Sequence, residues 1–293
     1  MSSSASGQSS RGAVLVTGAS TGIGRATALH LGPLGFEVFA GIRREGDGQR
    51  LVADSSGGVT PVILDVTDED SITTAAERIE EVIGDGRLHG LVNNAGIAEP
   101  APVELLPLDA LRHQLEVNVV GQVAVTQAVL PQLRRARGRI VNMSSIGGRR
   151  ASPALGAYAA SKFAIEALSD AMRMELHPWG IEVSVIEPGS IRTEIWRRGA
   201  ERADALFERV PPDRAQLYSD LIEAVRGMAE RTAGRAVPPE RVAGRVAHAL
   251  TARRPRTRYL VGTDARIQAA LASLLPDRGF DAVVRRMLRS ARR

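Results

Sequence analysis

Residues 13–24 read AVLVTGASTGIG, and this stretch decides the fold. A short apolar run ends in three closely spaced glycines, Gly18, Gly22 and Gly24, and a helical pattern of apolar residues follows directly. Glycine lets the backbone turn tightly, and the N–H groups at the start of a helix attract a phosphate. Turns and close packing also use glycine, so the loop alone is weak evidence. Its place between a strand and a helix predicts a phosphate-binding turn.

Strand-like and helix-like segments alternate from residue 12 to residue 190. The short β-branched runs are GAVLVTG, EVFAGI, VTPVILDV, LHGLVNN, RIVNMS and IEVSVIEP, and TRYLVG adds a last strand at 257–262. Apolar residues at helical spacing lie between them, notably over 68–84, 104–136 and 152–178. The alternation predicts an α/β fold, a Rossmann-type doubly wound parallel sheet of about seven strands with helices on both faces.

The chain divides into one domain with appendages. Residues 1–11 are polar, with neither a basic nor an apolar region of a secretory signal, and are expected to form a disordered tail. No linker or repeat interrupts 12–262, which we interpret as a single domain. Within it, 192–238 breaks the alternation, and a segment of that length between strands predicts a lid over a substrate. Residues 263–293 predict a basic helical extension.

Composition excludes several classes of protein. The chain is 44% apolar and 24% charged, without an apolar run long enough to span a bilayer, so a soluble cytoplasmic protein is expected. It has no cysteine, and its five histidines are scattered, which argues against disulfides, thiolate chemistry and any metal site. The five arginines after Asp281 account for the whole net charge of +5, so the rest of the chain is neutral overall. Aromatic residues are also few, and both facts argue against a nucleic-acid partner.

The same terminal arginines alternate with apolar residues over 282–293. This pattern is typical of a packed helix with one solvated face, which is the favoured interpretation. Peripheral contact with an anionic membrane surface is the alternative. No transmembrane segment is expected in either case.

Tyr158 and Lys162 stand out because of their spacing and their rarity. Lys162 is the one lysine among 38 basic residues, and Tyr158 is one of three tyrosines. Residues four apart lie on one face of a helix. A nearby ammonium favours the phenolate and lowers the pKa of tyrosine toward neutral pH, where acid–base catalysis is efficient. An isolated pair of this kind is usually just an exposed helix face, but the coincidence of two rare residues favours a catalytic pair.

Several motifs in order resemble the short-chain dehydrogenase/reductase family, in its single-domain branch. They are the G-x-x-x-G-x-G spacing from Gly18, the run Asn93-Asn94-Ala95-Gly96, Asn118, Ser145, Tyr158-x-x-x-Lys162 and Pro188-Gly189. The resemblance covers 12–262 and implies an NADP-binding catalytic domain that transfers a hydride between nicotinamide and an alcohol or carbonyl. The segments around Ser145 and Tyr158, and Arg256-Thr-Arg-Tyr259, look like hydroxysteroid and retinol dehydrogenases, which implies a bulky apolar substrate such as a steroid, retinoid or lipid-like molecule.

The resemblance also implies a role for each matching residue. Tyr158 is the proton donor and acceptor, Lys162 lowers its pKa and binds the nicotinamide ribose, Ser145 polarises the substrate oxygen, and Asn118 keeps a water in the proton relay. The cofactor is expected to contact Gly18, Ser20, Thr21, Gly22, Ile23, Gly24, Arg43, Asp65, Val66, Asn93, Ala95, Gly96, Tyr158, Lys162, Pro188, Gly189, Ile191 and Thr193. Some have plainer alternatives, since Asp65 could cap a turn and Val66 could belong to the sheet core.

The end of the second strand predicts NADP(H) rather than NAD(H). Ile42 stands where NAD enzymes carry an acidic residue, and Arg43 can offer the 2′-phosphate a planar pair of charged donors. The alternative is that Arg43 and Arg44 form a solvated turn. Arg149 and Arg150, near the expected pocket, admit an anionic group on the substrate.

A homodimer or homotetramer is expected, with the alanine-rich helices 104–136 and 152–178 packed against symmetry mates. Two other classes are weighed against the enzyme. A catalytically silent, NADP(H)-sensing binding protein usually lacks the tyrosine or the lysine, and an extended-branch epimerase or dehydratase has a different glycine spacing and a larger C-terminal domain.

Overall fold

Seven parallel strands form one sheet in the computed structural model, which describes residues 11–84 and 87–291. The strand order is β3-β2-β1-β4-β5-β6-β7, and all pairs are parallel, as predicted. The strands are β1 (Ala13–Val16), β2 (Glu37–Ile42), β3 (Val59–Ile63), β4 (Leu88–Asn93), β5 (Arg139–Met143), β6 (Glu182–Pro188) and β7 (Arg258–Val261). The predicted N-terminal tail lies outside the described residues, apart from Arg11.

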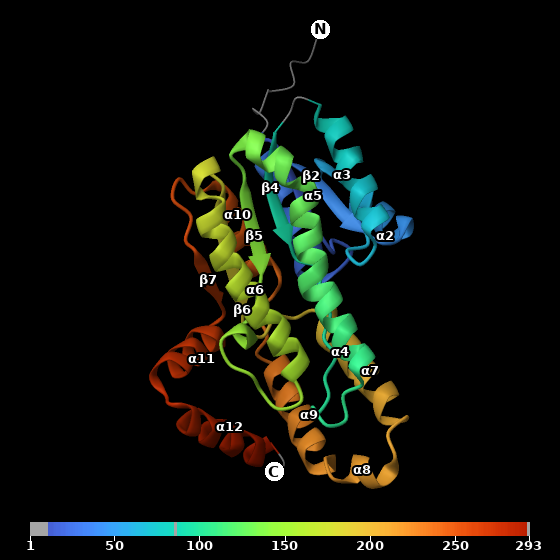
Figure 1. Ribbon diagram of the computed structural model, residues 1–293, viewed down its shortest axis with the longest axis vertical. Helices are drawn as coiled ribbons and strands as arrows, with labels where there is room; N and C mark the ends of the chain where they lie inside the picture. The colour runs from blue at the N-terminus through green and yellow to red at the C-terminus, as the bar shows by residue number, and fades with distance from the viewer. Residues whose placement is uncertain (1–10, 85–86, 292–293) are drawn as a thin grey trace.

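Helices cover both faces of the sheet because its strands are apolar on both sides (Figure 1). Helices α1 (Gly22–Leu31), α2 (Glu45–Asp54) and α10 (Glu240–Thr251) pack Leu31, Leu51 and Val246 onto one face. On the other face lie α3 (Glu69–Ile83), α5 (Gly121–Ala136) and α6 (Gly156–Glu175). The strand order reverses between β1 and β4, which is where doubly wound sheets bind their ligands.

The helix predicted at 104–136 consists of three parts. They are α4 (Leu108–Leu115), a π-helical segment η2 (Glu116–Val120) and α5. The predicted continuous α-helix is therefore wrong, and the interruption lies at Asn118, whose side chain bonds to the backbone of Ile97 in a neighbouring loop. Such π-helical turns are frequent at functional sites. The helix expected at 152–178 is shorter than predicted, because residues 152–155 form the loop that leads into α6.

The segment 192–238 folds into three helices beyond the carboxyl ends of the strands, at the lower end of Figure 1. They are α7 (Glu194–Phe207), α8 (Pro212–Gln216) and α9 (Ser219–Ala233). The Tyr218 hydroxyl donates a hydrogen bond of 2.8 Å to Glu104, and Arg202 donates to the Ala98 carbonyl at 3.4 Å. The three helices are thus attached to the loop that follows β4.

The C-terminal extension forms α11 (Thr263–Leu274) and α12 (Asp277–Ala291), and α12 packs along α9. Arg150 forms an ion pair with Asp277 at the start of α12, and Arg231 donates a hydrogen bond to the Ser290 carbonyl near its end. Leu288 is buried whereas Met287 is half exposed. The helix therefore uses part of its apolar face inside the protein. Within 11–84 and 87–291, no helix is long and apolar enough to cross a membrane.

Three short 3-10 helices complete the described secondary structure. They are η1 (Gly32–Leu34), η3 (Ile146–Gly148) and η4 (His177–Trp179). Of these, η3 matters for function because it directly follows Ser145, whose hydroxyl accepts a hydrogen bond of 3.1 Å from the Gly147 amide.

Candidate active site

A cleft of about 1330 Å³, open to solvent, runs along the carboxyl ends of the strands. Most of the residues that the sequence proposes for a site line this one cleft, although they come from all parts of the chain. They are Gly18, Ser20, Thr21, Gly22, Ile23, Arg43, Asp65, Val66, Ala95, Gly96, Ser145, Tyr158, Lys162, Pro188, Gly189, Ile191 and Thr193. The fold brings them together because parallel strands deliver the loops that follow them to the same edge.

Three predicted residues do not line the cleft: Gly24, Asn93 and Asn118. A side chain at Gly24 would collide with the Gly18 carbonyl, so this glycine is needed for close packing of α1 against the turn. The Asn93 side chain is buried and donates hydrogen bonds of 2.9 Å to Thr126 and Asn142. It points into the protein, toward α5 and β5.

Asn94 takes the place on the cleft wall that the sequence assigned to Asn93. Its side-chain amide donates to the carbonyls of Thr17 and Gly18, at 2.9 and 3.2 Å, and its backbone amide donates to the Thr17 hydroxyl at 2.9 Å. Asn94 therefore joins the end of β4 to the glycine turn after β1. The pair Asn93-Asn94 is visible in the sequence, but only the orientation of β4 decides which of the two faces the cleft.

Asn118 lies fully buried in the π-helical segment η2. Its side-chain oxygen accepts from the Ile97 amide at 2.8 Å, and its nitrogen donates to the Ile97 carbonyl and to the Ser161 hydroxyl, both at 3.0 Å. Both amide hydrogens are thus used inside the protein. The Asn118 side chain holds the loop after β4 against α6.

Tyr158 and Lys162 project from α6 to the floor of the cleft, and both are buried. The Lys162 ammonium lies 5.7 Å from the centre of the Tyr158 ring and donates a hydrogen bond of 2.8 Å to the Met143 carbonyl. Burial lowers the pKa of Lys162 and the carboxylate of Glu166 partly opposes this, which leaves the pKa at about 8. Burial raises the pKa of Tyr158, and the Ser145 hydroxyl lowers it. The expected lowering of the tyrosine pKa is thus outweighed by burial in the protein alone.

Asp65, Val66 and Arg43 line the end of the cleft near β2 and β3. Asp65 accepts hydrogen bonds from the amide and hydroxyl of Thr67, at 3.0 and 2.8 Å, so it also caps a turn. Val66 also belongs to the hydrophobic core, so both plainer alternatives hold alongside their place in the cleft. Arg43 is exposed and lines the cleft, whereas exposed Arg44 does not.

The residues of the cleft fit a dinucleotide. The glycine turn leads into the start of α1, where backbone N–H groups attract phosphate. Gly22 has a φ of +56°, and a side chain there would lie 3.2 Å from Thr193 across the cleft, so the two walls come close at this point. Backbone approach of this kind suits a pyrophosphate better than a bulky organic group.

Trp196 is the main site residue that sequence reasoning missed. It lies in the first turn of α7 and meets Tyr158 edge to face, with ring centres 5.4 Å apart and planes at 62°. Other residues of α4 and α7 on the cleft wall are His113, Glu194, Ile195, Arg198 and Arg202. No sequence motif marks α4 or α7, so only their position in the fold identifies these residues.

Arg149 and Arg150 do not serve the cleft, and the expectation that they bind an anionic substrate group is wrong. Arg149 donates to both oxygens of Glu187, at 2.7 and 2.9 Å. Arg150 pairs with Asp277 and donates to two carbonyls at the end of α11. Their charges are used in joining the loop after β5 to β6 and to the C-terminal helices. No cluster of acidic and histidine side chains that could hold a metal ion occurs among the described residues.

Comparison with known proteins places these features in context. The family model "short chain dehydrogenase" matches residues 12–204. Retinol dehydrogenase 5 of Mus musculus is 37% identical, over 92% of this chain and 87% of its own length. The 17-beta-hydroxysteroid dehydrogenase type 6 of Bos taurus is 37% identical over 93% and 87%, and the NADPH-dependent 3-dehydrocapnine reductase of Ornithobacterium rhinotracheale is 34% identical over 92% and 94%.

Solved structures agree with the sheet topology. A short-chain dehydrogenase from Streptomyces avermitilis superposes with a TM-score of 0.76 at 30% identity and covers 94% of each chain. A short chain dehydrogenase from Burkholderia cenocepacia in complex with NADP gives a TM-score of 0.70 at 26% identity, over 95% of this chain and 98% of that one.

Proposed function

The chain belongs to the short-chain dehydrogenase/reductase family, of the hydroxysteroid and retinol dehydrogenase type, and we propose that this oxidoreductase uses NADP(H) to interconvert a bulky apolar alcohol and its carbonyl compound. The observation that carries the proposal is the grouping of Tyr158, Lys162 and Ser145 in the cleft that begins at the glycine turn. These three side chains supply an acid–base group, a positive charge and a hydroxyl donor. Together they can handle the proton and the charge at a reacting oxygen.

Each residue has a task in this reaction. The Ser145 hydroxyl donates a hydrogen bond to the substrate oxygen and aligns it with Tyr158. Tyr158 gives its proton to that oxygen during reduction and takes it back during oxidation. The Lys162 ammonium stabilises the phenolate left on Tyr158. The nicotinamide of the bound cofactor supplies or accepts the hydride. Asn118 and Asn94 keep the loop after β4 in place, and Trp196 limits the access of water to Tyr158.

Arg43 supports the preference for NADP(H). It lines the cleft beside Ile42, at the end of β2, and no acidic side chain occupies the place where the ribose of NAD would be recognised. A relative of similar length is NADPH-dependent by name, and a structural neighbour was solved with NADP, which agrees with this choice of cofactor.

An apolar substrate agrees with part of the lining of the cleft. Ile97, Val117, Ile195 and Trp196 contribute apolar surface to its wall. The relatives named for retinol and hydroxysteroids support the same class of substrate. We also propose that the enzyme acts as a homo-oligomer.

The proposal is tested by following NADPH oxidation with a panel of ketones, aldehydes, retinoids, steroids and 3-oxoacyl compounds. Tyr158→Phe is the matched control because it removes the transferable proton and little else. For the best substrate we expect the variant to lose about 10²–10⁴-fold in kcat while the Kd for NADPH stays nearly unchanged. A variant that keeps more than roughly a hundredth of the activity would remove Tyr158 from the mechanism.

A further inference from the structure

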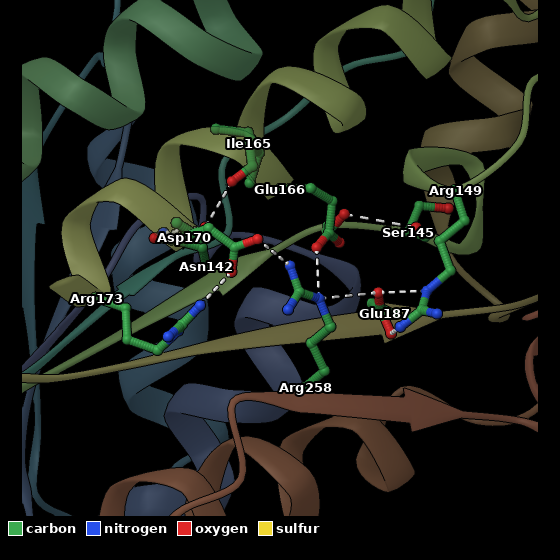
Figure 2. Close-up of polar contacts among 11 residues, drawn as sticks. Asn142, Ser145, Arg149, Ile165, Glu166, Asp170, Arg173, Glu187 and Arg258 are labelled. Atoms are coloured by element: carbon green, nitrogen blue, oxygen red, sulfur yellow. Dashed lines mark hydrogen bonds and ion pairs between the residues drawn. The ribbon is translucent and has the colours of Figure 1, made fainter.

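A partly buried group of charged side chains lies behind the catalytic residues, between α6, β6 and β7. We call Arg149, Glu166, Asp170, Glu187 and Arg258 the rear charge cluster (Figure 2). Arg258 donates to Glu166 at 3.0 Å and to Asp170 at 2.9 Å, and its Nε lies 3.8 Å from Glu187. Glu187 is completely buried and is also held by both donors of Arg149. The proposed mechanism gives this cluster no task.

Glu166 is the member of the rear charge cluster that reaches the active site. It follows Lys162 by four residues on α6, which places both on one face of the helix. The Glu166 side chain and the backbone of Lys162 both lie close to Gly148 of η3, since a Cβ there would lie 3.1 Å from Glu166 Cγ and 3.1 Å from the backbone carbonyl of Lys162. Glu166 is the acidic residue whose charge acts on Lys162.

We propose that Glu166 is a positioning residue that keeps the Lys162 side chain in its charged form, and that Arg258 holds Glu166 ionised in the protein interior for this purpose. The inference rests on the proposed role of Lys162 in the reaction. Glu166 thereby supports the catalytic pair of Tyr158 and Lys162. It acts through Lys162 and does not touch the substrate.

The electrostatic reason is the burial of Lys162. Removal from water lowers its pKa, which is about 8 even with the charge of Glu166 nearby, so without that charge the ammonium would lose its proton at a still lower pH. The negative charge of Glu166 opposes this loss. The ammonium itself donates to a neutral carbonyl and not to a carboxylate. Glu166 therefore supplies the negative counter-charge for the Lys162 ammonium from one helical turn away.

Glu166 needs support of its own, because burial raises its pKa and the nearby charge of Glu187 raises it further. Arg258 from β7 and the Ser144 hydroxyl after β5 lower it. Asp170, on the next turn of α6, binds Arg258 as well, and Arg149 neutralises Glu187 from the side of η3. The charged and polar groups that act on Glu166 thus come from the end of β5, from β6 and from β7. When acid protonates Glu166, Lys162 is charged in any case, so the support matters at and above neutral pH.

The chain offers an unusually direct test, since Lys162 is its only lysine. Protein made with isotope-labelled lysine gives one lysine side-chain signal by NMR, and its shift against pH reports the protonation of Lys162 alone. We expect Glu166→Gln to lower the titration midpoint by about one pH unit. Asp170→Asn is the matched control, because it also removes a carboxylate from Arg258 but stands one turn further from Lys162, and it should leave the midpoint unchanged. Glu166→Asp, which keeps the charge, should restore most of the wild-type value.

An unchanged midpoint in Glu166→Gln overturns the inference, and so does an equal decrease in Asp170→Asn. Should Glu166→Gln not fold, the double variant Glu166→Met with Arg258→Met removes both partners and leaves no unpaired charge at this position. Its midpoint should also be lower. The NMR measurement needs no turnover, so it stands even if the substrate panel fails. For an active enzyme, the alkaline limb of kcat/KM for alcohol oxidation should move to lower pH in Glu166→Gln but not in Asp170→Asn.

Discussion

Lys162 is a charged side chain with only 4% of its surface exposed, and no carboxylate binds it directly. Such a position is costly, because a buried ammonium loses the hydration it has in the unfolded chain. The cost appears as the decrease of its pKa from the ordinary value of 10.5 to about 8. At the residue scale, the enzyme therefore gives up stability at neutral pH in order to have a compact positive charge beside Tyr158.

This cost predicts an unusual dependence of stability on pH. The folded pKa of Lys162 is lowered, so between about pH 8 and 10.5 the unfolded chain binds a proton that the folded protein does not. Stability then rises with pH across this window, by up to about 3 kcal/mol in total. Urea unfolding at several pH values from 7 to just below 10 measures the slope.

Lys162→Met, which keeps the length but not the charge, is the control for that measurement and should remove the rise. No cysteine and no second lysine titrates in this pH range, because the chain has neither. Tyr158 acts in the opposite direction, since its pKa is raised, but only above its ordinary value of 10. A wild-type protein whose stability stays flat or falls between pH 8 and 10 contradicts the prediction.

Arg43 carries the second prediction at this scale, which concerns the choice of cofactor. Arg43→Leu should lower the ratio of kcat/KM for NADP(H) over NAD(H) by about ten- to a hundredfold, because a charge-assisted bond contributes roughly 1.5–3 kcal/mol. Arg44→Leu is the matched control, since Arg44 is equally exposed but does not line the cleft. Ile42 is 2% exposed and packs against α2, so an aspartate there would bury a charge and is a poorer test. If the two variants show the same ratio of kcat/KM for NADP(H) over NAD(H), Arg43 has no role in the choice of cofactor.

Among the elements, α7 has the most direct influence on the reaction. It begins directly after Thr193 on the cleft wall and places Trp196 across the face of the site from α6. Its attachment to the loop after β4, through Arg202 and Gly199, is made of few polar contacts and a close backbone approach.

The position of α7 predicts a specific fluorescence change when the cofactor binds. The chain has two tryptophans, Trp196 in the cleft and Trp179 in η4, where Arg134 covers its ring at 4.5 Å. Bound NADPH quenches a nearby tryptophan by energy transfer, which falls steeply with distance. NADPH should therefore quench the Trp179→Phe protein strongly and the Trp196→Phe protein weakly. The reverse order would mean that α7 does not cover the cofactor.

At the scale of the whole molecule, the outer face of α6 exposes a stripe of apolar side chains. Ala160, Phe163, Ala167 and Met174 are exposed and recur at helical spacing on the side away from the sheet. Ala159, which also belongs to the alanine-rich stretch, is buried in its own subunit and cannot contribute to an interface. A flat apolar stripe with small residues suits a two-fold contact between identical helices.

A homo-oligomer built on this stripe should depend on Phe163. Light scattering at micromolar concentration should show a dimer or tetramer for the wild type and a shift toward monomer for Phe163→Glu. Ile267→Glu, at another exposed apolar position, on α11, is the control and should leave the mass unchanged. A monomeric wild-type protein rules out the interface.

The parts that the sequence by itself determined are those in which neighbours along the chain make the structure. The strand, glycine turn and helix at 13–31, the alternation that produces the parallel sheet, and the spacing of Tyr158 and Lys162 on one helix all depend on local periodicity. The order of motifs then led to the family and to the cleft. Local periodicity also misled at η2, because the break in the helix depends on a bond from Asn118 to a residue outside it.

Only the tertiary structure decided which side chains face the cleft and which partners neutralise the buried charges. Asn94 rather than Asn93 lines the cleft, Arg149 and Arg150 bind acids elsewhere, and Trp196 meets Tyr158 from α7, which carries no motif. The rear charge cluster joins Glu166 to Arg258, which is 92 residues away in the chain. The physical reason is that a buried charge is stabilised by the polar and charged groups that pack around it. Long-range contacts between elements decide which groups these are, and spacing along the chain does not.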